Sequence, residues 1–203
     1  MAVHRFPLTV LLVIIFLAGT MTLPAGSFSA PVRRSTTADL RAAAAIVVRA
    51  MRDRDARALV ATVHPSKGVR FSPGAFVDPS SDVVLSRAAI RRLWADRRIY
   101  RWGYTDGTGE PIELTPAQYI ARYTLPPTAL APDSIRVDHD RVVSSSRNNA
   151  ASVYPGAHRV EYYWNRINPA ADPQFDWLAL RLVFEPIKGQ WFLVGIIRER
   201  WGP

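Results

Sequence analysis

Two segments of the chain concentrate the residue types that acid–base chemistry and anion binding require. The first runs from His64 to Pro73 and places Lys67 and Arg70 on either side of Gly68. Histidine exchanges protons near neutral pH, so His64 is the candidate general acid or base. The two cations are candidate ligands for a carboxylate or phosphate, to which arginine presents a two-pronged donor. The alternative interpretation is that His64 caps a helix end and that both cations are solvated.

The second segment, Tyr100–Ile112, combines glycines with two carboxylates and two aromatic rings. Asp106 and Glu110 are candidate catalytic carboxylates that would orient the histidine or act as a base. Trp102 and Tyr104 are candidate ligand-binding residues, because their flat apolar faces suit a sugar or a ring. Two structural interpretations stay open: Asp-Gly is a common turn dipeptide, and the tryptophan would equally well cover the core.

Other constellations predict no metal site and no cofactor. The chain has no cysteine, which excludes disulfides, thiolate metal sites and a cysteine nucleophile. It contains no phosphate-binding loop, dinucleotide fingerprint, nucleophile elbow or zinc-protease motif. Asp138-His139-Asp140 is interpreted as a surface run, and His158 stands alone beside a turn.

The first half of the chain is predicted to be mainly helical. A helix capped by Thr37 carries an apolar stripe at helical spacing, and Asp55 caps a shorter helix that ends before Pro65. Ser86 caps a third helix, and Thr115 begins a fourth. The predicted ranges end at about Met51, Val63, Asp96 and Tyr123, with a strand from Lys67 to Val77 and a loop from Trp102 to Glu110.

The second half is predicted to be rich in β-strands. Strands are expected at Val153–Tyr154 and Arg159–Asn165, followed by a terminal hairpin around Lys188-Gly189. The arms of this hairpin are Leu178–Glu185 and Trp191–Arg198. Helices followed by antiparallel strands indicate an α+β fold, with N-terminal helices packed on a curved antiparallel sheet. This element order resembles the nuclear-transport-factor-2-like (NTF2-like) cone.

The N-terminus is predicted to be an export signal. A basic start precedes an uncharged run from Leu8 to Gly19, which is short for a membrane span. Residues 1–30 are therefore assigned to a signal peptide and its cleavage region, with an uncleaved anchor as the alternative. Residues 31–36 are a linker, and residues 37–203 form a single domain. Either interpretation places the domain outside the cytoplasm.

The charge of the chain is strongly basic. Its 203 residues include 26 Lys and Arg against 17 Asp and Glu, giving a net charge of +9. The arginines are scattered and no recognition module is present, so nucleic acid is not expected as a partner. Clusters at Arg91-Arg92 and at Arg97, Arg98 and Arg101 would suit anionic envelope polymers. The alternative is that the excess of arginine over lysine reflects the base composition of the genome, and that these charges are simply solvated.

The two segments and the end of the chain resemble a widespread family of exported bacterial proteins and lipoproteins. The resemblance covers roughly Asp39 to Trp201, including Leu180–Phe184 and Trp191–Gly195. Its motifs correspond to the HPSKGVRFSP and WGYTDGTGEPI stretches of this chain. The family has no established activity, so the resemblance implies location and one-domain architecture. Many relatives carry a lipid-attachment cysteine that this chain lacks, and lipid anchoring is therefore not carried over.

These features favour a non-catalytic module that binds a small ligand or an envelope component in a pocket near His64 and Asp106. The alternative function is a small enzyme of hydrolase or isomerase type, in which His64 works with Asp106 or Glu110. A third hypothesis assigns the arginine clusters to anionic envelope polymers. Membrane contact is expected only through the N-terminal segment, and only if that segment is not cleaved.

Overall fold

The computed structural model describes residue 1 and the ranges 36–105, 107–140, 147–168, 170–172 and 174–200. The predicted signal peptide and almost all of the predicted linker lie outside these residues, as does Asp106. The chain divides into the units 1–31 and 32–203, and the elements below belong to the second. Within the described residues, no helix is both long and apolar enough to cross a bilayer.

The first two helices begin at side-chain caps that the sequence carries. Helix α1 (Thr37–Arg52) is capped by Thr36, whose hydroxyl accepts from the Asp39 N–H while the Asp39 side chain accepts from the Thr36 N–H. The cap is thus one residue earlier than predicted. Helix α2 (Ala56–Thr62) is capped by Asp55, as predicted.

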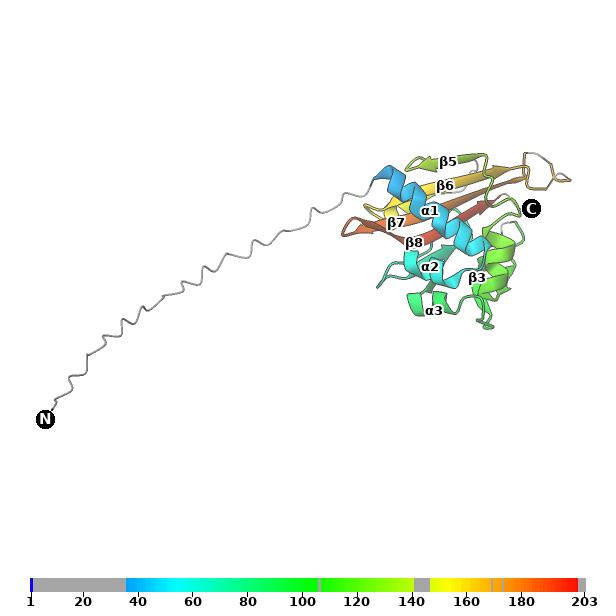
Figure 1. The fold of residues 1–203 in the computed structure, drawn as a ribbon. Coiled ribbons are helices and arrows are strands. Elements are labelled where there is room, and N and C mark those ends of the chain that lie inside the picture. The colour runs from blue at the N-terminus through cyan, green and yellow to red at the C-terminus, as the bar shows by residue number, and fades with distance from the viewer. Residues whose placement is uncertain (2–35, 106, 141–146, 169, 173, 201–203) are drawn as a thin grey trace. The chain divides into compact units, whose positions relative to one another are not determined.

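A six-stranded sheet forms the body of the domain (Figure 1). Its strand order is β2-β1-β8-β7-β6-β5, and every neighbouring pair is antiparallel except β1–β8. The sheet was predicted to be antiparallel, and the structure shows that it is mixed. The reason is that β1, which follows α2, runs parallel to β8. The strands are β1 (Val69–Ser72), β2 (Val83–Leu85), β5 (Ser134–Val137), β6 (His158–Asn165), β7 (Trp177–Ile187) and β8 (Gln190–Arg200).

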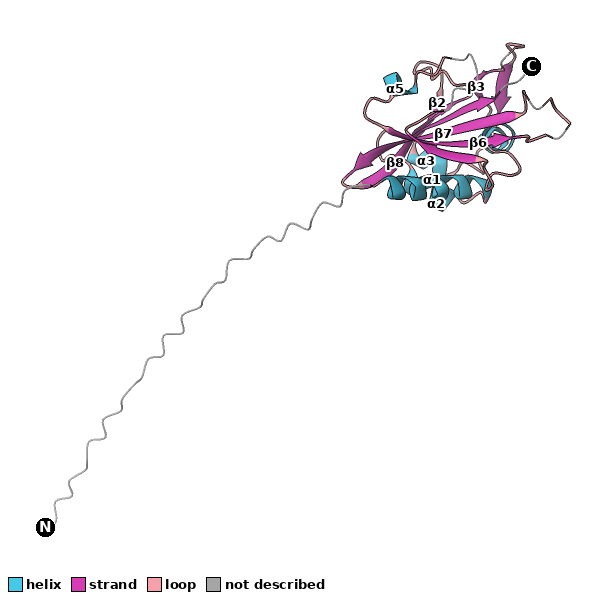
Figure 2. Cartoon of the chain, turned by 90° about the horizontal axis from the view of Figure 1, so that it is seen from above, coloured by secondary structure: helices cyan, strands magenta, loops and turns pink. Residues whose placement is uncertain are grey.

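Helices α1 and α2 cover one face of the sheet, and the α5 segment lies on the opposite face (Figure 2). The main core lies under α1, where its buried residues Leu40, Val47 and Met51 join apolar side chains of the sheet. A smaller cluster on the other face contains Tyr154, Val183 and Val194. The predicted α+β fold, with N-terminal helices packed on a curved sheet, is confirmed.

The remaining elements differ in part from the prediction. Residues 100–114 form a hairpin of β3 (Tyr100–Tyr104) and β4 (Pro111–Leu114), where a loop was expected from Trp102 onward. Val153 belongs to the short helix α5 (Ala150–Val153) and not to a strand. Helix α3 (Arg87–Arg91) is shorter than predicted, and helix α4 (Pro116–Tyr119) continues as the π-helix η1 (Ile120–Thr124).

The predicted terminal hairpin is confirmed and carries a buried charge network. Strands β7 and β8 pair along their whole length around Lys188-Gly189, where both residues have positive φ. Arg181 on β7 is 1% exposed, and its guanidinium contacts Glu161 of β6 at 2.9 Å and Glu199 of β8 at 2.6 Å. Burying one charge without its partners is costly, so removal of any one of these three side chains should destabilise the sheet.

Candidate functional site

His64 is held between the end of α2 and strand β8. The His64 backbone N–H donates to the Leu193 carbonyl oxygen at 2.9 Å, and His64 as a whole is 6% exposed. The imidazole Nδ1 accepts from the Lys67 N–H at 3.0 Å, which places the ring proton of neutral His64 on Nε2. Burial lowers the pKa of His64, and the Glu185 carboxylate opposes that shift. His64 is therefore neutral at pH 7 and fixes the turn that follows it.

Glu185 on β7 joins His64 to Lys67. Its Oε2 lies 3.8 Å from His64 Nε2 and 2.5 Å from Lys67 Nζ. The carboxylate is one-fifth exposed, whereas the lysine side chain is largely exposed. Sequence reasoning missed Glu185; the signal was a charged residue near the end of a strand whose one other charged residue is Arg181. The structure thus places a cation, a carboxylate and a neutral imidazole side by side.

The turn between His64 and β1 depends on Gly68. Its φ is +70°, and a Cβ at this position would lie 2.5 Å from the Leu85 carbonyl oxygen of β2. Only glycine accepts both this backbone conformation and this close approach. Gly68 thereby lets Lys67 lie beside Glu185 while β1 stays paired with β2.

Lys67, Arg70 and Glu185 line one hollow of about 570 Å³. Its other walls come from β2, β8 and α5. The α5 segment lies on the face of the sheet opposite α1 (Figure 2). The other lining residues are Pro79, Val84, Ser152, Val153, Tyr154 and Val194. The ionisable side chains in this wall are two cations, one carboxylate and one phenol.

Arg70 and Tyr154 form the polar floor of this hollow. Nη1 of Arg70 donates to the carbonyl oxygens of Asp78 at 3.3 Å and Pro79 at 3.1 Å, which orients the guanidinium. Tyr154 is 8% exposed, and its buried hydroxyl makes no hydrogen bond of normal geometry to the described residues. Burial raises the pKa of Tyr154 to about 12, and nearby Arg70 opposes this rise. Sequence reasoning assigned Tyr154 to a strand and did not identify it as a site residue.

The second predicted segment does not line this hollow. Among the described residues of the β3–β4 hairpin, none is in its wall. Trp102 is fully buried, donates from Nε1 to the Leu114 carbonyl oxygen, and stacks on Tyr119 with ring centroids 4.0 Å apart. No ring face is left for a ligand, so the predicted stacking role of Trp102 is corrected to a role in the core.

Tyr104 and Glu110 are exposed near the end of the same hairpin. The Glu110 N–H donates to the Thr105 hydroxyl at 3.1 Å, as in a tight turn. Asp106 lies outside the described residues, so its predicted pairing with His64 stays a prediction. The structure brings His64 and Lys67 together at Glu185, and it places Lys67, Arg70 and Glu185 in the wall of the hollow. His64 itself, Trp102, Tyr104 and Glu110 are not in that wall.

The two sequence motifs meet in the core instead. Phe71 of the first contacts Trp102 of the second edge to face, with centroids 5.4 Å apart. A Cβ on Gly103 would lie 2.5 Å from Cγ of Pro73, and Gly103 has a φ of +140°. Much of the unusual composition of both segments therefore serves to pack the β3–β4 hairpin against β1.

A histidine–aspartate pair lies elsewhere on the sheet. His158 Nδ1 is 2.7 Å from Asp138 Oδ2, and both side chains are partly exposed. Sequence analysis had treated His158 as isolated, because 20 residues separate the pair along the chain. Neither residue is in the wall of the hollow. Among the described residues, no group of three His, Asp or Glu side chains is placed to hold a metal ion.

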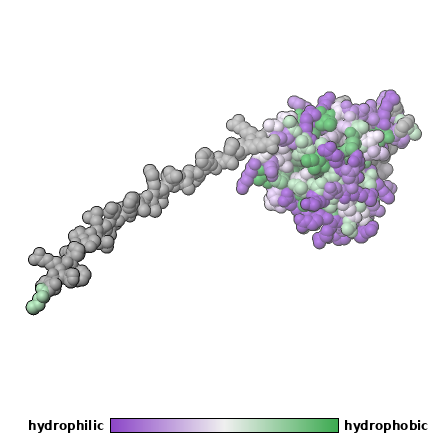
Figure 3. Space-filling view, viewed as in Figure 1, coloured by the Kyte–Doolittle hydropathy of each residue, from purple (hydrophilic) through white to green (hydrophobic). Residues whose placement is uncertain are grey.

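The arginine clusters of α3 and β3 are partly neutralised. Arg98 pairs with Asp96 at 2.7 Å, and Arg101 pairs with Glu113 at 2.9 Å. Arg91, Arg92 and Arg97 are exposed, and hydrophilic side chains dominate the lower part of the domain surface in Figure 3. Exposed charges of this kind are ordinary on a soluble surface.

Comparisons with known proteins assign no function to the chain. No protein-family model matches the chain, and no curated protein matches it. A designed NTF2-like protein of known structure is similar to it, with 15% identity and a TM-score of 0.36. The match covers 78% of this chain and 95% of the designed protein. This likeness is too remote to indicate a site.

Proposed function

We propose that this protein is a non-catalytic binding module that holds a small anionic molecule, a carboxylate or a phosphate, in the hollow beside His64. One observation carries the proposal: the buried Tyr154 hydroxyl makes no hydrogen bond of normal geometry to the described residues, although Arg70 is close to it, and Tyr154 lines the same hollow as Lys67 and Arg70. A buried hydroxyl without a partner is unfavourable, and a bound oxygen would supply that partner.

The charge of the wall supports an anion as the ligand. Two cations face one carboxylate, and Lys67 already pairs with that carboxylate. Arg70 is oriented by the carbonyl oxygens of the 78–82 loop, so its guanidinium loses little freedom when it binds a carboxylate or phosphate. The hollow falls within the usual size range of small-molecule sites.

The geometry favours binding over acid–base catalysis. His64 Nδ1 accepts a backbone N–H, and Nε2 faces a carboxylate that Lys67 holds. A general base needs a free nitrogen within reach of the substrate proton. The sequence-based pairing of His64 with Asp106 or Glu110 gains no support from the described residues, because the His64 ring contacts Lys67 and Glu185, and the Glu110 backbone bonds within its own turn.

The proposal includes export. The uncharged N-terminal run and the resemblance to exported bacterial proteins support a location outside the cytoplasm. Mass spectrometry of the protein recovered from the extracytoplasmic fraction tests this part. A mature chain that begins near residue 28 supports export and cleavage, whereas a full-length chain in the cytoplasmic fraction contradicts export.

Calorimetric titration with inorganic phosphate and with citrate tests the binding proposal. At least one anion should bind, and Tyr154→Phe and Lys67→Ala should each weaken binding about tenfold, since each removes a donor to a charged ligand. Arg97→Ala is the matched control, because it removes an exposed charge outside the hollow. No binding of either anion, or equal loss in the control, contradicts the proposal.

A further inference from the structure

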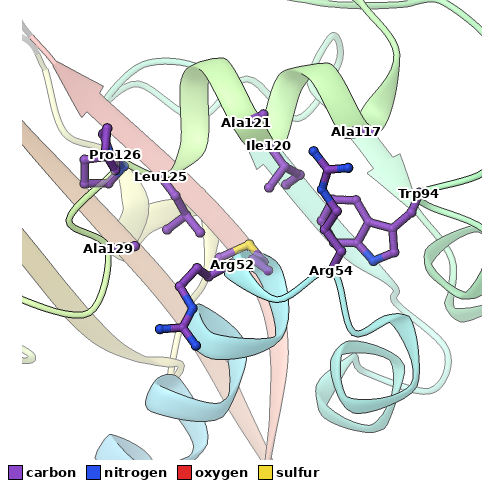
Figure 4. A pocket seen from close by; sticks show the side chains of 11 residues that line it. Arg52, Arg54, Trp94, Ala117, Ile120, Ala121, Leu125, Pro126 and Ala129 are labelled. Carbon is purple, nitrogen blue, oxygen red and sulfur yellow. The ribbon is translucent and has the colours of Figure 1, made fainter.

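A second concave site lies on the helical side of the domain (Figure 4). It is a groove of about 240 Å³ between the end of α1, the α4–η1 segment and the loop at 125–129. Met51, Ile120 and Leu125 supply much of its apolar wall. In Figure 4, Leu125, Pro126 and Ala129 lie on one side of the groove, and Trp94 and Arg54 lie on the other. None of its lining residues belongs to the hollow beside His64.

The polar side chains of this groove are all hydrogen-bond donors. The Trp94 indole N–H is buried and has no partner among the described residues. Arg52 and Arg54 are exposed, and both line the groove. Arg52 is already paired with Asp53 at 2.6 Å, whereas Arg54 makes no side-chain hydrogen bond or ion pair with the described residues. Arginine and tryptophan side chains cannot accept hydrogen bonds, so their common ligand must be an acceptor.

Two backbone irregularities border the same groove. Arg54 has a φ of +57°, which is rare and unfavourable for a residue with a side chain. Ile120 and Ala121 belong to a π-helical turn, a feature that often marks functional sites. Both irregularities lie where the chain presents lining residues of the groove.

We propose that this groove binds a small amphipathic carboxylate, such as a medium-chain fatty acid. Its carboxylate accepts from the Trp94 indole N–H and pairs with Arg54, and its apolar tail lies against Met51, Ile120 and Leu125. The tail matches the apolar wall, and the negative head matches the Arg54 guanidinium and the unpaired Trp94 indole N–H. This site is independent of the anion proposed beside His64.

Calorimetric titration of the protein with octanoate tests this proposal. Octanoate should bind, and octanol should bind at least tenfold more weakly because it lacks the charge. Trp94→Phe keeps an aromatic ring but removes the donor, and should weaken octanoate binding about tenfold. Arg54→Asn should weaken it by a similar factor, and asparagine tolerates the left-handed backbone.

A blocking variant separates the groove from general effects. Ala121→Leu adds a side chain to the exposed rim of the groove and should abolish octanoate binding. Ala42→Leu makes the same change on an exposed position of α1 outside the groove, and should leave binding unchanged. Tyr154→Phe should also leave it unchanged, which distinguishes this site from the hollow beside His64.

Three results would overturn the proposal. They are the absence of octanoate binding, binding that survives Ala121→Leu in a folded variant, and equal affinity for octanoate and octanol. Circular dichroism should be used to check that each variant is folded, so that a loss of binding in the Ala121→Leu protein can be assigned to the groove and not to unfolding.

Discussion

The Tyr154 hydroxyl gives the most discriminating prediction, because removing it should stabilise the empty protein and weaken the liganded one. Tyr154 is 8% exposed, its hydroxyl makes no hydrogen bond of normal geometry to the described residues, and its ring packs on Gly195. An unsatisfied buried polar group costs about 1–3 kcal/mol. The closeness of Arg70 recovers part of that cost. Tyr154→Phe should therefore raise the free energy of unfolding by about 1 kcal/mol.

The same substitution should reduce the stabilisation that a ligand provides. At a ligand concentration of about 100 times Kd, binding stabilises the native protein by about 2.7 kcal/mol. If the variant binds about tenfold more weakly, its stabilisation falls to about 1.4 kcal/mol at that concentration. The advantage of the variant without ligand should thus disappear when phosphate or citrate is added.

Urea unfolding, monitored by fluorescence with and without the anion, measures both effects. Tyr100→Phe is the contrasting control, because the Tyr100 hydroxyl donates to Asp96 at 2.9 Å and its removal should cost about 1 kcal/mol. If Tyr154→Phe instead loses 1 kcal/mol or more without ligand, the hydroxyl has a partner in the native protein and the reasoning is refuted.

Three further predictions concern the surrounding structure. His64→Asn keeps an acceptor for the Lys67 N–H. Because burial lowers the pKa of His64 below 6.5, the wild-type protein should lose stability relative to this variant as the pH falls from about 7 to about 5. The same difference in the free energy of unfolding at both pH values, measured with urea, would contradict this. Gly103→Ala should lower the free energy of unfolding by about 2 kcal/mol, because φ is positive there and the new Cβ clashes with the Pro73 ring. A Cβ at Gly74 meets nothing within 4 Å, so Gly74→Ala should be nearly neutral. Equal effects of the two variants in thermal unfolding would refute the packing argument. Arg181→Ala leaves two buried glutamates without their cation and should cost about 3–5 kcal/mol in urea unfolding, so a loss below about 1 kcal/mol would show that the network is not important for stability.

Local signals predicted the terminal hairpin and the helix caps at Asp55, Ser86 and Thr115, and placed the cap of α1 one residue too late. Asp55 and Thr115 cap helices through bonds that span only three residues, and Lys188-Gly189 turns a chain whose arms are adjacent in sequence. Such contacts depend on near neighbours, so periodicity and turn residues identify them. The β3–β4 hairpin was missed because the glycines of residues 103–109 suggested a loop, although its strands pair at both ends.

The candidate site could be predicted only in part for the opposite reason. His64, Lys67 and Arg70 lie close together in sequence and were identified from their types. Glu185 is 118 residues from Lys67, and Tyr154 reaches the hollow from a segment on the other side of the sheet from α1. Trp102 was misassigned because a tryptophan next to glycines is compatible with either a binding surface or a core. Only the stacking on Tyr119 distinguishes the two.

The central claim is that the hollow beside His64 receives an anionic group. A crystal structure of the protein soaked with phosphate or citrate tests this claim most directly. The account predicts an anion in the hollow, with one oxygen within hydrogen-bond distance of the Tyr154 hydroxyl and others near Arg70 and Lys67. An empty hollow at a ligand concentration that saturates binding in solution, or an anion bound only elsewhere, would contradict it.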